Sequence, residues 1–302
     1  MDSDFLTSRM TGIFFGLGIG DAIGKPVNGL SAFEIMSRYQ TVDAFYSHKH
    51  EKPGQYSPVA RDAFYVARSI YENGTINVDD LTQKITIKER ESQPDFLPRV
   101  VPLAAYLCFN PVDDITILKS CKDVVFITQK EKSLVLPAFV IAKTIIDCIR
   151  NRKALDNPSD LYQSDRSLLA RIIETLQQAE KKLDPKPKIL FSDRIVFTRK
   201  KLQAKATTEE FLGINGNRDA EECAAFSLFC FLKSPDSFNS VITAASMGGS
   251  ASVNACLVGS MIGAYTGTIC FAQDFKDNVE NSAKILSWGE NFVEKFFKEE
   301  ST

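Results

Sequence analysis

The sequence predicts an all-α protein that forms one compact helical domain over residues 1–302. Helical periodicity of apolar residues dominates the chain, whereas strand-like patterns are few and short. The 44% share of apolar residues and the 25% share of charged residues are typical of a soluble globular protein with a large core. Breaks between the helical blocks are too short to be interdomain linkers, and no repeat of solenoid period is visible.

The helical segments can be followed along the chain. The clearest amphipathic helix is expected over Ser167–Leu183, where Leu169 and Ile172 begin an apolar face. Leu134–Ile149 is apolar almost all round, which predicts a buried helix, and Pro137 fits only in its first turn. Further helices are expected over Arg61–Tyr71, Glu221–Leu232, Ser240–Ala245, a stretch that ends at Gly267, and Lys276–Lys298.

Strand signals are confined to two short stretches. Lys188–Phe191 and Ile195–Phe197 lack alternation over a useful length and fit a loop equally well. Breaks rich in proline and aspartate separate the helical blocks at Pro53–Pro58, Gln93–Pro98, Asn110–Asp114, Asp156–Asp160 and Asp184–Lys188.

Charge and hydropathy exclude several classes of partner. The 36 basic and 38 acidic residues give a net charge of -2 and are mixed along the chain, so no nucleic-acid or membrane partner is expected. The acidic N-terminus does not resemble a secretory signal. The most apolar window, Ala255–Ala272, is interrupted by Gly, Ser and Thr. We therefore expect a cytoplasmic protein, and a nuclear location is equally compatible.

Cysteine and histidine usage argues against redox or zinc chemistry. The seven cysteines are scattered, mostly in apolar helical patterns without a C-x-x-C pair, which predicts buried free thiols. The two histidines, His48 and His50, share one charged loop. A Cys–His nucleophilic pair or a zinc site is therefore not expected.

Three segments are rich in glycine and small residues. They are Gly16–Pro26, Pro53–Ala60, which leads into a helix, and Met247–Val253, whose Gly-Gly turn opens another helix. As a G-x-G-x-x-G fingerprint the first segment is weak, because no strand precedes it, and close packing of a helix through its glycines explains it equally well.

The order and spacing of these segments resemble the ADP-ribosylglycohydrolase family. Gly20–Pro26 is similar to the family's G-D-A-x-G-x-P helix, and the other two segments align with G-x-Y-T-D-D-T and G-G-D-x-D-T. Weaker similarities lie at Arg99–Leu103, Leu212–Gly216 with Glu222, and Gly259–Gly267. The resemblance covers about residues 10–270 and implies a compact all-α fold. It is greatest to the branch that cleaves ADP-ribose chains and serine-linked ADP-ribose.

The departures from the family pattern fall on its metal ligands. In the family, hydroxyl groups and carboxylates of these motifs hold two divalent ions, usually magnesium, beside the ribose. Here T-D-D-T is replaced by Ser57, Pro58, Val59 and Ala60, D-x-D-T is replaced by Ser250, Ala251, Ser252 and Val253, and the acidic residue after the first motif becomes Asn28. Magnesium prefers carboxylate and other oxygen ligands. The resemblance therefore implies no catalytic residue, no metal ligand and no cofactor.

A vestigial pocket is nevertheless expected where the three motifs meet. Asp21 and Asp62 are the nearby carboxylates; we expect Asp21 to cap or brace the glycine-rich helix and Asp62 to favour the N-terminal end of the next one. The hydroxyl groups and the Gly-Gly turn are a possible ADP-ribose or anion site. The predicted pocket comprises Asp21, Asn28, Ser57, Pro58, Val59, Gly248, Gly249, Ser250, Ser252 and Val253.

Three functions are compatible with this pattern. The first is a non-catalytic structural protein, because the sequence resembles the jellyfish eye-lens crystallins of this family and its balanced charge suits crowded solutions. The second is a pseudoenzyme that binds ADP-ribose or a protein partner. The third is an active hydrolase with metal ligands from elsewhere in the chain. No pattern predicts an oligomeric state or a particular protein partner.

Overall fold

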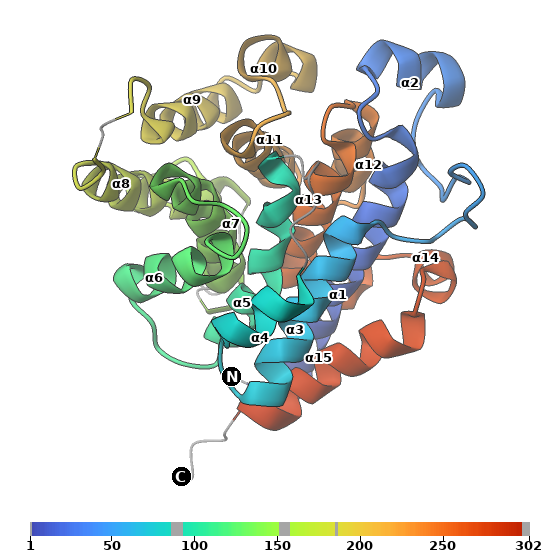
Figure 1. The fold of residues 1–302 in the computed structure, drawn as a ribbon. Coiled ribbons are helices and arrows are strands. Elements are labelled where there is room, and N and C mark those ends of the chain that lie inside the picture. The colour runs from blue at the N-terminus through green and yellow to red at the C-terminus, as the bar shows by residue number, and fades with distance from the viewer. Residues whose placement is uncertain (1, 86–92, 151–157, 185–186, 298–302) are drawn as a thin grey trace.

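The all-α prediction is confirmed by the structure, a computed structural model (Figure 1). It describes residues 2–85, 93–150, 158–184 and 187–297, and within them it contains fifteen α-helices and no strand. The helices are α1 (Ser3–Gly24), α2 (Ala32–Tyr39), α3 (Pro58–Asn73), α4 (Val78–Lys84), α5 (Val100–Leu107), α6 (Asp114–Val125), α7 (Val135–Arg150), α8 (Leu168–Glu180), α9 (Phe191–Gln203), α10 (Thr208–Asn215), α11 (Ala220–Lys233), α12 (Asn239–Ser246), α13 (Ala251–Thr266), α14 (Gln273–Asn278) and α15 (Ser282–Phe296).

Helices α1 and α13 form the centre of the molecule. Both are buried along almost their whole length. Helices α3 and α15 pack beside α1, whereas α7, α11 and α12 pack against α13 (Figure 1). The sequence-distant first and third motifs therefore lie on two helices that are in direct contact.

Glycines bring these two helices together in an antiparallel pair. A Cβ atom on Gly16 would lie only 2.1 Å from the carbonyl oxygen of Gly259, so the two backbones touch directly. The same approach recurs at every fourth residue, which lies on the same face of a helix. It pairs Gly12 with Gly263, Gly20 with Ala255 and Gly24 with Ala251. The glycines of the first segment therefore serve close helix packing.

One segment has the length and composition of a membrane span. Within the described residues, Ala251–Cys270 has a mean hydropathy of 1.3, but 72% of this stretch is buried inside the protein. It contains α13, which packs against α1. Its apolar character is therefore explained by the core of the fold.

The helix predicted over Lys276–Lys298 is wrong as one continuous element. It is two helices, α14 and α15, and Lys298 lies outside the described residues. The break falls at Asn281, whose φ of 56° is left-handed, and at Glu280, whose N–H donates to the carbonyl oxygen of Gly54 at 2.9 Å. A tertiary hydrogen bond has replaced the helical one at this point.

The structure also corrects two smaller expectations about secondary structure. Ile195–Phe197 is part of α9, where Ile195 is buried, so its strand-like pattern belongs to a helix. The break at Gln93–Pro98 is a 3₁₀ helix, Gln93–Arg99. Of the break at Asp156–Asp160, residues 156 and 157 lie outside the described residues, and the rest belongs to a 3₁₀ helix, Pro158–Leu161.

The prediction of free thiols is confirmed. All seven cysteines are free, and Cys270 alone among them is half-buried. Burial raises the pKa of the Cys270 thiol to about 11, and it raises the pKa values of the other six thiols further.

Candidate functional site

The three motifs meet where α1 ends and where α3 and α13 begin. Asp21, on α1, is fully buried and joins the first motif to the second. Its carboxylate accepts hydrogen bonds from the backbone N–H of Ser57 at 2.7 Å, from the Ser57 hydroxyl at 3.0 Å and from the N–H of Ala60 at 3.2 Å. Asp21 therefore caps α3 and not the glycine-rich helix that carries it, which corrects the expectation.

The N-terminus of α3 is closed by these contacts. Pro58 is the first helical residue and has no N–H to satisfy. The N–H of Val59 donates to the Ser57 hydroxyl at 3.0 Å, the next one donates to Asp21, and that of Arg61 donates to the Ser57 carbonyl at 3.2 Å. A helix normally leaves its first N–H groups without partners. Here every one of them is satisfied within the chain.

Burial determines the ionisation of Asp21. Desolvation raises the pKa of its carboxyl above the ordinary value of 3.8, and hydrogen bonds from Ser57 and Ala60 oppose that shift only in part. Ser252, from the start of α13, also lowers the pKa of this carboxyl. Its hydroxyl is nevertheless a buried group without a hydrogen bond of good geometry in the described residues. Asp21 and Ser252 thus lie side by side, as the motif alignment predicts.

The other residues of the predicted pocket face in different directions. The N–H of Ser252 donates to the side-chain oxygen of Asn28 at 3.2 Å, so Asn28 caps the first turn of α13. The Ser250 hydroxyl donates to the carbonyl of Arg218 at 3.4 Å. Val253 is buried in the core. Pro58, by contrast, is exposed, and Val59 is half-buried.

The Gly-Gly turn is tied to the chain that follows the first motif. The N–H of Gly249 donates to the carbonyl of Leu30 at 2.9 Å, and that of Gly29 donates to the carbonyl of Gly249 at 2.7 Å. The N–H of Gly248 donates to Ala245 at 3.2 Å. An anion at this turn would have to displace these bonds, because neither glycine amide is free.

Asn217 is a site residue that the motif analysis missed. Its side-chain amide donates to the carbonyl of Gly248 at 2.9 Å, and its own carbonyl accepts from Ser250 at 3.1 Å. A Cβ atom on Gly249, which has a φ of 64°, would lie 1.9 Å from the Asn217 side-chain oxygen. The sequence signal was an asparagine directly after the Gly216 turn.

Lys25 is the second missed residue. Its ammonium donates to the carbonyl oxygens of Gln55 at 3.3 Å and Tyr56 at 3.4 Å, and it forms an ion pair with Glu51. It therefore ties the end of α1 to the second motif. Its signal was a single cation near the end of a glycine-rich segment whose only other charged residue is Asp21.

Asp62 has a structural partner. Its carboxylate forms an ion pair with Arg99 at 2.9 Å, and Arg99, only 2% exposed, also donates to the Thr128 hydroxyl at 2.8 Å. The pair joins α3 to the residue that precedes α5. Instead of interacting mainly with the dipole of α3, Asp62 balances a buried charge. Among the described residues, no three or more His, Cys, Asp or Glu side chains are placed to hold a metal ion.

The protein is thus an all-α protein whose glycine-packed helices bring three polar motifs to one buried site. Comparison with protein families specifies the class. The model of the family described as ADP-ribosylglycohydrolase matches residues 88–302, so the chain belongs to the ADP-ribosylglycohydrolase family.

A solved structure described as an ADP-ribosylglycohydrolase-related protein complex has the same fold. The similarity covers 97% of this chain and 100% of that chain, with a TM-score of 0.71 and 17% sequence identity. At this identity the likeness is one of fold. A search of curated proteins gives no match.

Proposed function

We propose that the chain is a catalytically inactive ADP-ribosylglycohydrolase-family protein that serves as a soluble structural protein of the cytoplasm, of lens-crystallin type. One observation carries the first half of this proposal. Where the three motifs meet, both oxygens of Asp21 accept hydrogen bonds from the start of α3. The carboxylate thus acts as a helix cap.

The donor groups at this site do not fit a pair of magnesium ions. Magnesium demands near-octahedral oxygen ligation with one or more carboxylates. Pro58, Val59 and Val253, at positions that carry ligands in the family pattern, have no side-chain oxygen. One charge pair at 4 Å contributes about 4 kcal/mol at an effective dielectric constant of 20. The loss of four carboxylates therefore exceeds the about 8 kcal/mol of a micromolar site.

Metal-free glycoside cleavage is equally disfavoured. Such a reaction uses one carboxylic acid and one carboxylate on opposite sides of the bond. Burial favours the protonated form of Asp21, and the Asp62 carboxylate is held by Arg99. Among the described residues at this site, Asp62 is therefore not free to act as base or nucleophile with Asp21.

The packing of the protein supports a long-lived structural role. Thiolate is the form of cysteine that reacts with oxidants and disulfides. Burial raises the pKa values of all seven thiols, so little thiolate exists at neutral pH. A net charge of -2 spread over mixed signs leaves no large single-sign field to attract other macromolecules.

Calorimetry tests the proposal directly. Magnesium chloride and ADP-ribose, titrated together into the native protein, are expected to give no binding heat. A serine-ADP-ribosylated peptide is expected to release no ADP-ribose. A variant with Pro58→Asp, Val59→Asp, Ser250→Asp and Ser252→Asp is the comparator, and magnesium is expected to raise its melting temperature. Hydrolysis by the native chain would refute inactivity.

Two outcomes would contradict the structural role alone. Binding of ADP-ribose without hydrolysis would favour a pseudoenzyme that senses this ligand. Scarcity of the protein in every tissue would exclude a crystallin, because a crystallin is a major soluble protein of a lens. Quantitative protein measurement across tissues therefore decides this half of the proposal.

A further inference from the structure

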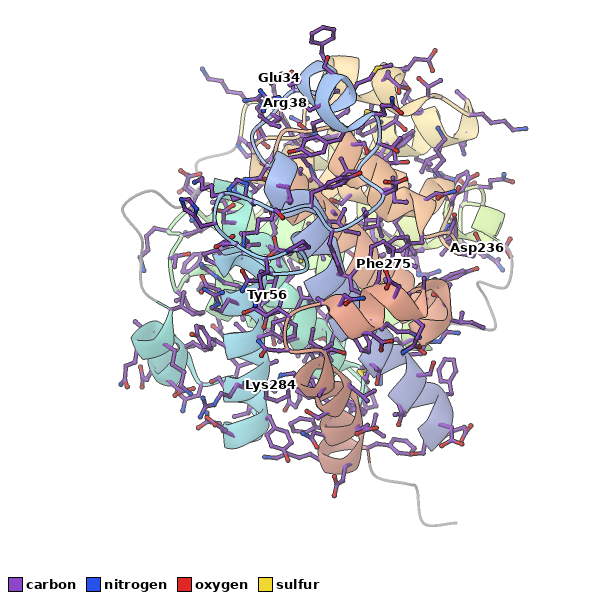
Figure 2. The ribbon with its side chains drawn as sticks, turned by 90° about the vertical axis from the view of Figure 1, so that its right-hand side faces the viewer. Glu34, Arg38, Tyr56, Asp236, Phe275 and Lys284 are labelled. Atoms are coloured by element: carbon purple, nitrogen blue, oxygen red, sulfur yellow. The ribbon has the colours of Figure 1, made fainter. Side chains whose placement is uncertain are left out.

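A pocket lies between α3 and α15, beside Tyr56 of the second motif. Tyr56 and Lys284 mark this face of the molecule in Figure 2. The cavity measures about 190 Å³. We call it the α3–α15 pocket, and it is lined by Tyr56, Arg61, Phe64, Tyr65, Arg68, Asn281, Lys284, Ile285 and Trp288. Three of these residues are cations, four are aromatic and none is a carboxylate.

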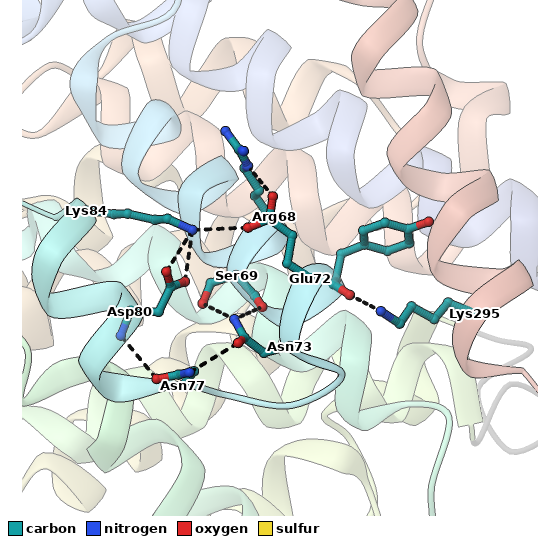
Figure 3. A network of polar contacts seen from close by, with 9 residues as sticks. Arg68, Ser69, Glu72, Asn73, Asn77, Asp80, Lys84 and Lys295 are labelled. Atoms are coloured by element: carbon teal, nitrogen blue, oxygen red, sulfur yellow. Dashed lines mark hydrogen bonds and ion pairs between the residues drawn. The ribbon is translucent and has the colours of Figure 1, made fainter.

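The charge of Arg68 is already balanced. Its Nε atom lies 2.6 Å from a carboxylate oxygen of Glu72 (Figure 3). The other oxygen of Glu72 binds the ammonium of Lys84 at 3.2 Å, and Lys84 also binds Asp80 at 2.9 Å. This network of two cations and two carboxylates is neutral. Arg68 therefore supplies hydrogen-bond donors to the pocket but no net charge.

Arg61 and Lys284 carry the unbalanced charge of the pocket. Neither forms an ion pair with any described residue. Burial raises the pKa of Tyr56, and the nearby Glu280, which does not line the pocket, adds to this shift. Glu51, which is paired with Lys25, acts electrostatically on Arg61 but does not line the pocket either. One oxygen of Glu280 is buried and has no hydrogen-bond partner in the described part of the chain. The pocket thus presents two cations without an ion-pair partner among the described residues, and no carboxylate lines it.

The walls of the pocket combine aromatic rings with the hydroxyl group of Tyr56, a hydrogen-bond donor. The Tyr56 hydroxyl accepts a hydrogen bond from the Asn281 side chain at 2.9 Å, which leaves its own proton free to donate. Tyr65 is 36% exposed and offers part of its ring to a ligand, whereas Trp288 is only 7% exposed. Aromatic rings pair favourably with other rings in offset or edge-to-face contacts.

We propose that the α3–α15 pocket binds a phosphate monoester carried on a single flat ring. A phosphate monoester has a charge between about -1.5 and -2 at pH 7, which matches the two free cations. A guanidinium group binds phosphate oxygens with two parallel hydrogen bonds. The cavity is smaller than the about 300 Å³ at which drug-sized sites begin. A compact ligand with one ring therefore fits better than a dinucleotide.

Trp288 provides the assay, because it is the only tryptophan of the chain. Phenyl phosphate, titrated into the native protein, is expected to change Trp288 fluorescence saturably. Inorganic phosphate and phenol, the two halves of this probe, are each expected to bind at least about tenfold more weakly, a difference of about 1.4 kcal/mol. The assay uses neither magnesium nor ADP-ribose, so its outcome is independent of the function proposed above.

Four variants make the test specific. Arg61→Gln with Lys284→Gln is expected to weaken phenyl phosphate binding at least about tenfold, and Glu280→Gln is expected to tighten it. Lys200→Gln, on the exposed surface of α9, is the matched control and is expected to change nothing. Melting temperatures identify any variant that has lost its fold.

Three results would overturn the proposal. The first is the lack of a saturable response up to about 10 mM phenyl phosphate, beyond the about 1 mM of weak specific binding. The second is equal binding by the double variant in its folded state. The third is equal binding of inorganic phosphate alone, which would reveal a simple anion site without ring recognition.

Discussion

Replacing Asp21 with alanine tests whether this carboxylate is the cap that closes α3. The substitution removes the acceptor of two backbone N–H groups and one hydroxyl, all at a buried junction. Leaving one buried donor without a partner costs about 1–3 kcal/mol. Loss of the buried carboxyl also removes its desolvation cost, so the three unpartnered donors are expected to give a net loss of about 3 kcal/mol. At about 2 °C per kcal/mol for a chain of this size, the melting temperature falls by about 6 °C.

The matched control is Asp113→Ala. Asp113 caps α6 in the same chemical way, because its carboxylate accepts from the N–H of Thr116 at 2.8 Å, but this helix end is exposed. Loss of such a cap costs about 1 kcal/mol, or about 2 °C. Differential scanning calorimetry of both variants measures the contrast. Equal losses would mean that Asp21 is no more than an ordinary surface cap.

Asp21→Asn adds a pH dependence whose sign follows from burial. Burial raises the folded-state pKa of Asp21, so its protonated form is favoured on folding. Its contribution to stability is complete below the ordinary pKa of about 3.9 and declines as pH rises through the folded value. Asparagine keeps the shape and has no proton to lose. The native protein should therefore lose stability relative to Asp21→Asn as pH rises from about 4, and a relative gain would refute the reasoning.

Three further variants or reagents test the packing. Gly16→Ala places a Cβ atom 2.1 Å from a backbone oxygen and should cost at least about 3 kcal/mol in urea unfolding, whereas Gly213→Ala, with no neighbour within 4 Å, should be neutral or stabilising by up to about 1 kcal/mol. Arg99→Met leaves the Asp62 carboxylate without its buried partner and should cost about 3–5 kcal/mol by the same measurement. Cys270 should react first with a thiol reagent, and mass spectrometry should find the other six modified only on unfolding, because they are fully buried.

Local patterns predicted the helices well, and tertiary contacts explain what they missed. Ser167–Leu183 reads as a helix from its periodicity alone, and α8 is found there. The break at Asn281 depends on a hydrogen bond from Glu280 to Gly54, more than 200 residues earlier, which no local pattern contains. The spacing of the glycines on α1 indicated close packing, but not which residues of α13 they meet.

For the candidate site, the sequence indicated some of the residues that lie together but not how they are organised. Motif alignment placed Asp21, Ser57 and Ser252 in one pocket, and the structure brings these three residues together. The direction of capping was missed, because a buried carboxylate on one helix satisfies another helix only through tertiary geometry. Asn217 was missed because it belongs to none of the three motifs.

In the proposed inactive protein, the loss of the metals and the loss of the carboxylates are energetically coupled. Four carboxylates gathered around two divalent ions are held together by those ions, and without them each pair at 4 Å would repel by about 4 kcal/mol at an effective dielectric constant of 20. Neutral residues at Pro58, Val59, Ser250 and Ser252 remove that repulsion. Asp21 is then free to accept from the start of α3, where Pro58 supplies a preorganised first residue. On the proposed function, the replacements that remove the metal ligands also stabilise the metal-free fold, so the variant with four added carboxylates should melt below the native protein until magnesium is supplied.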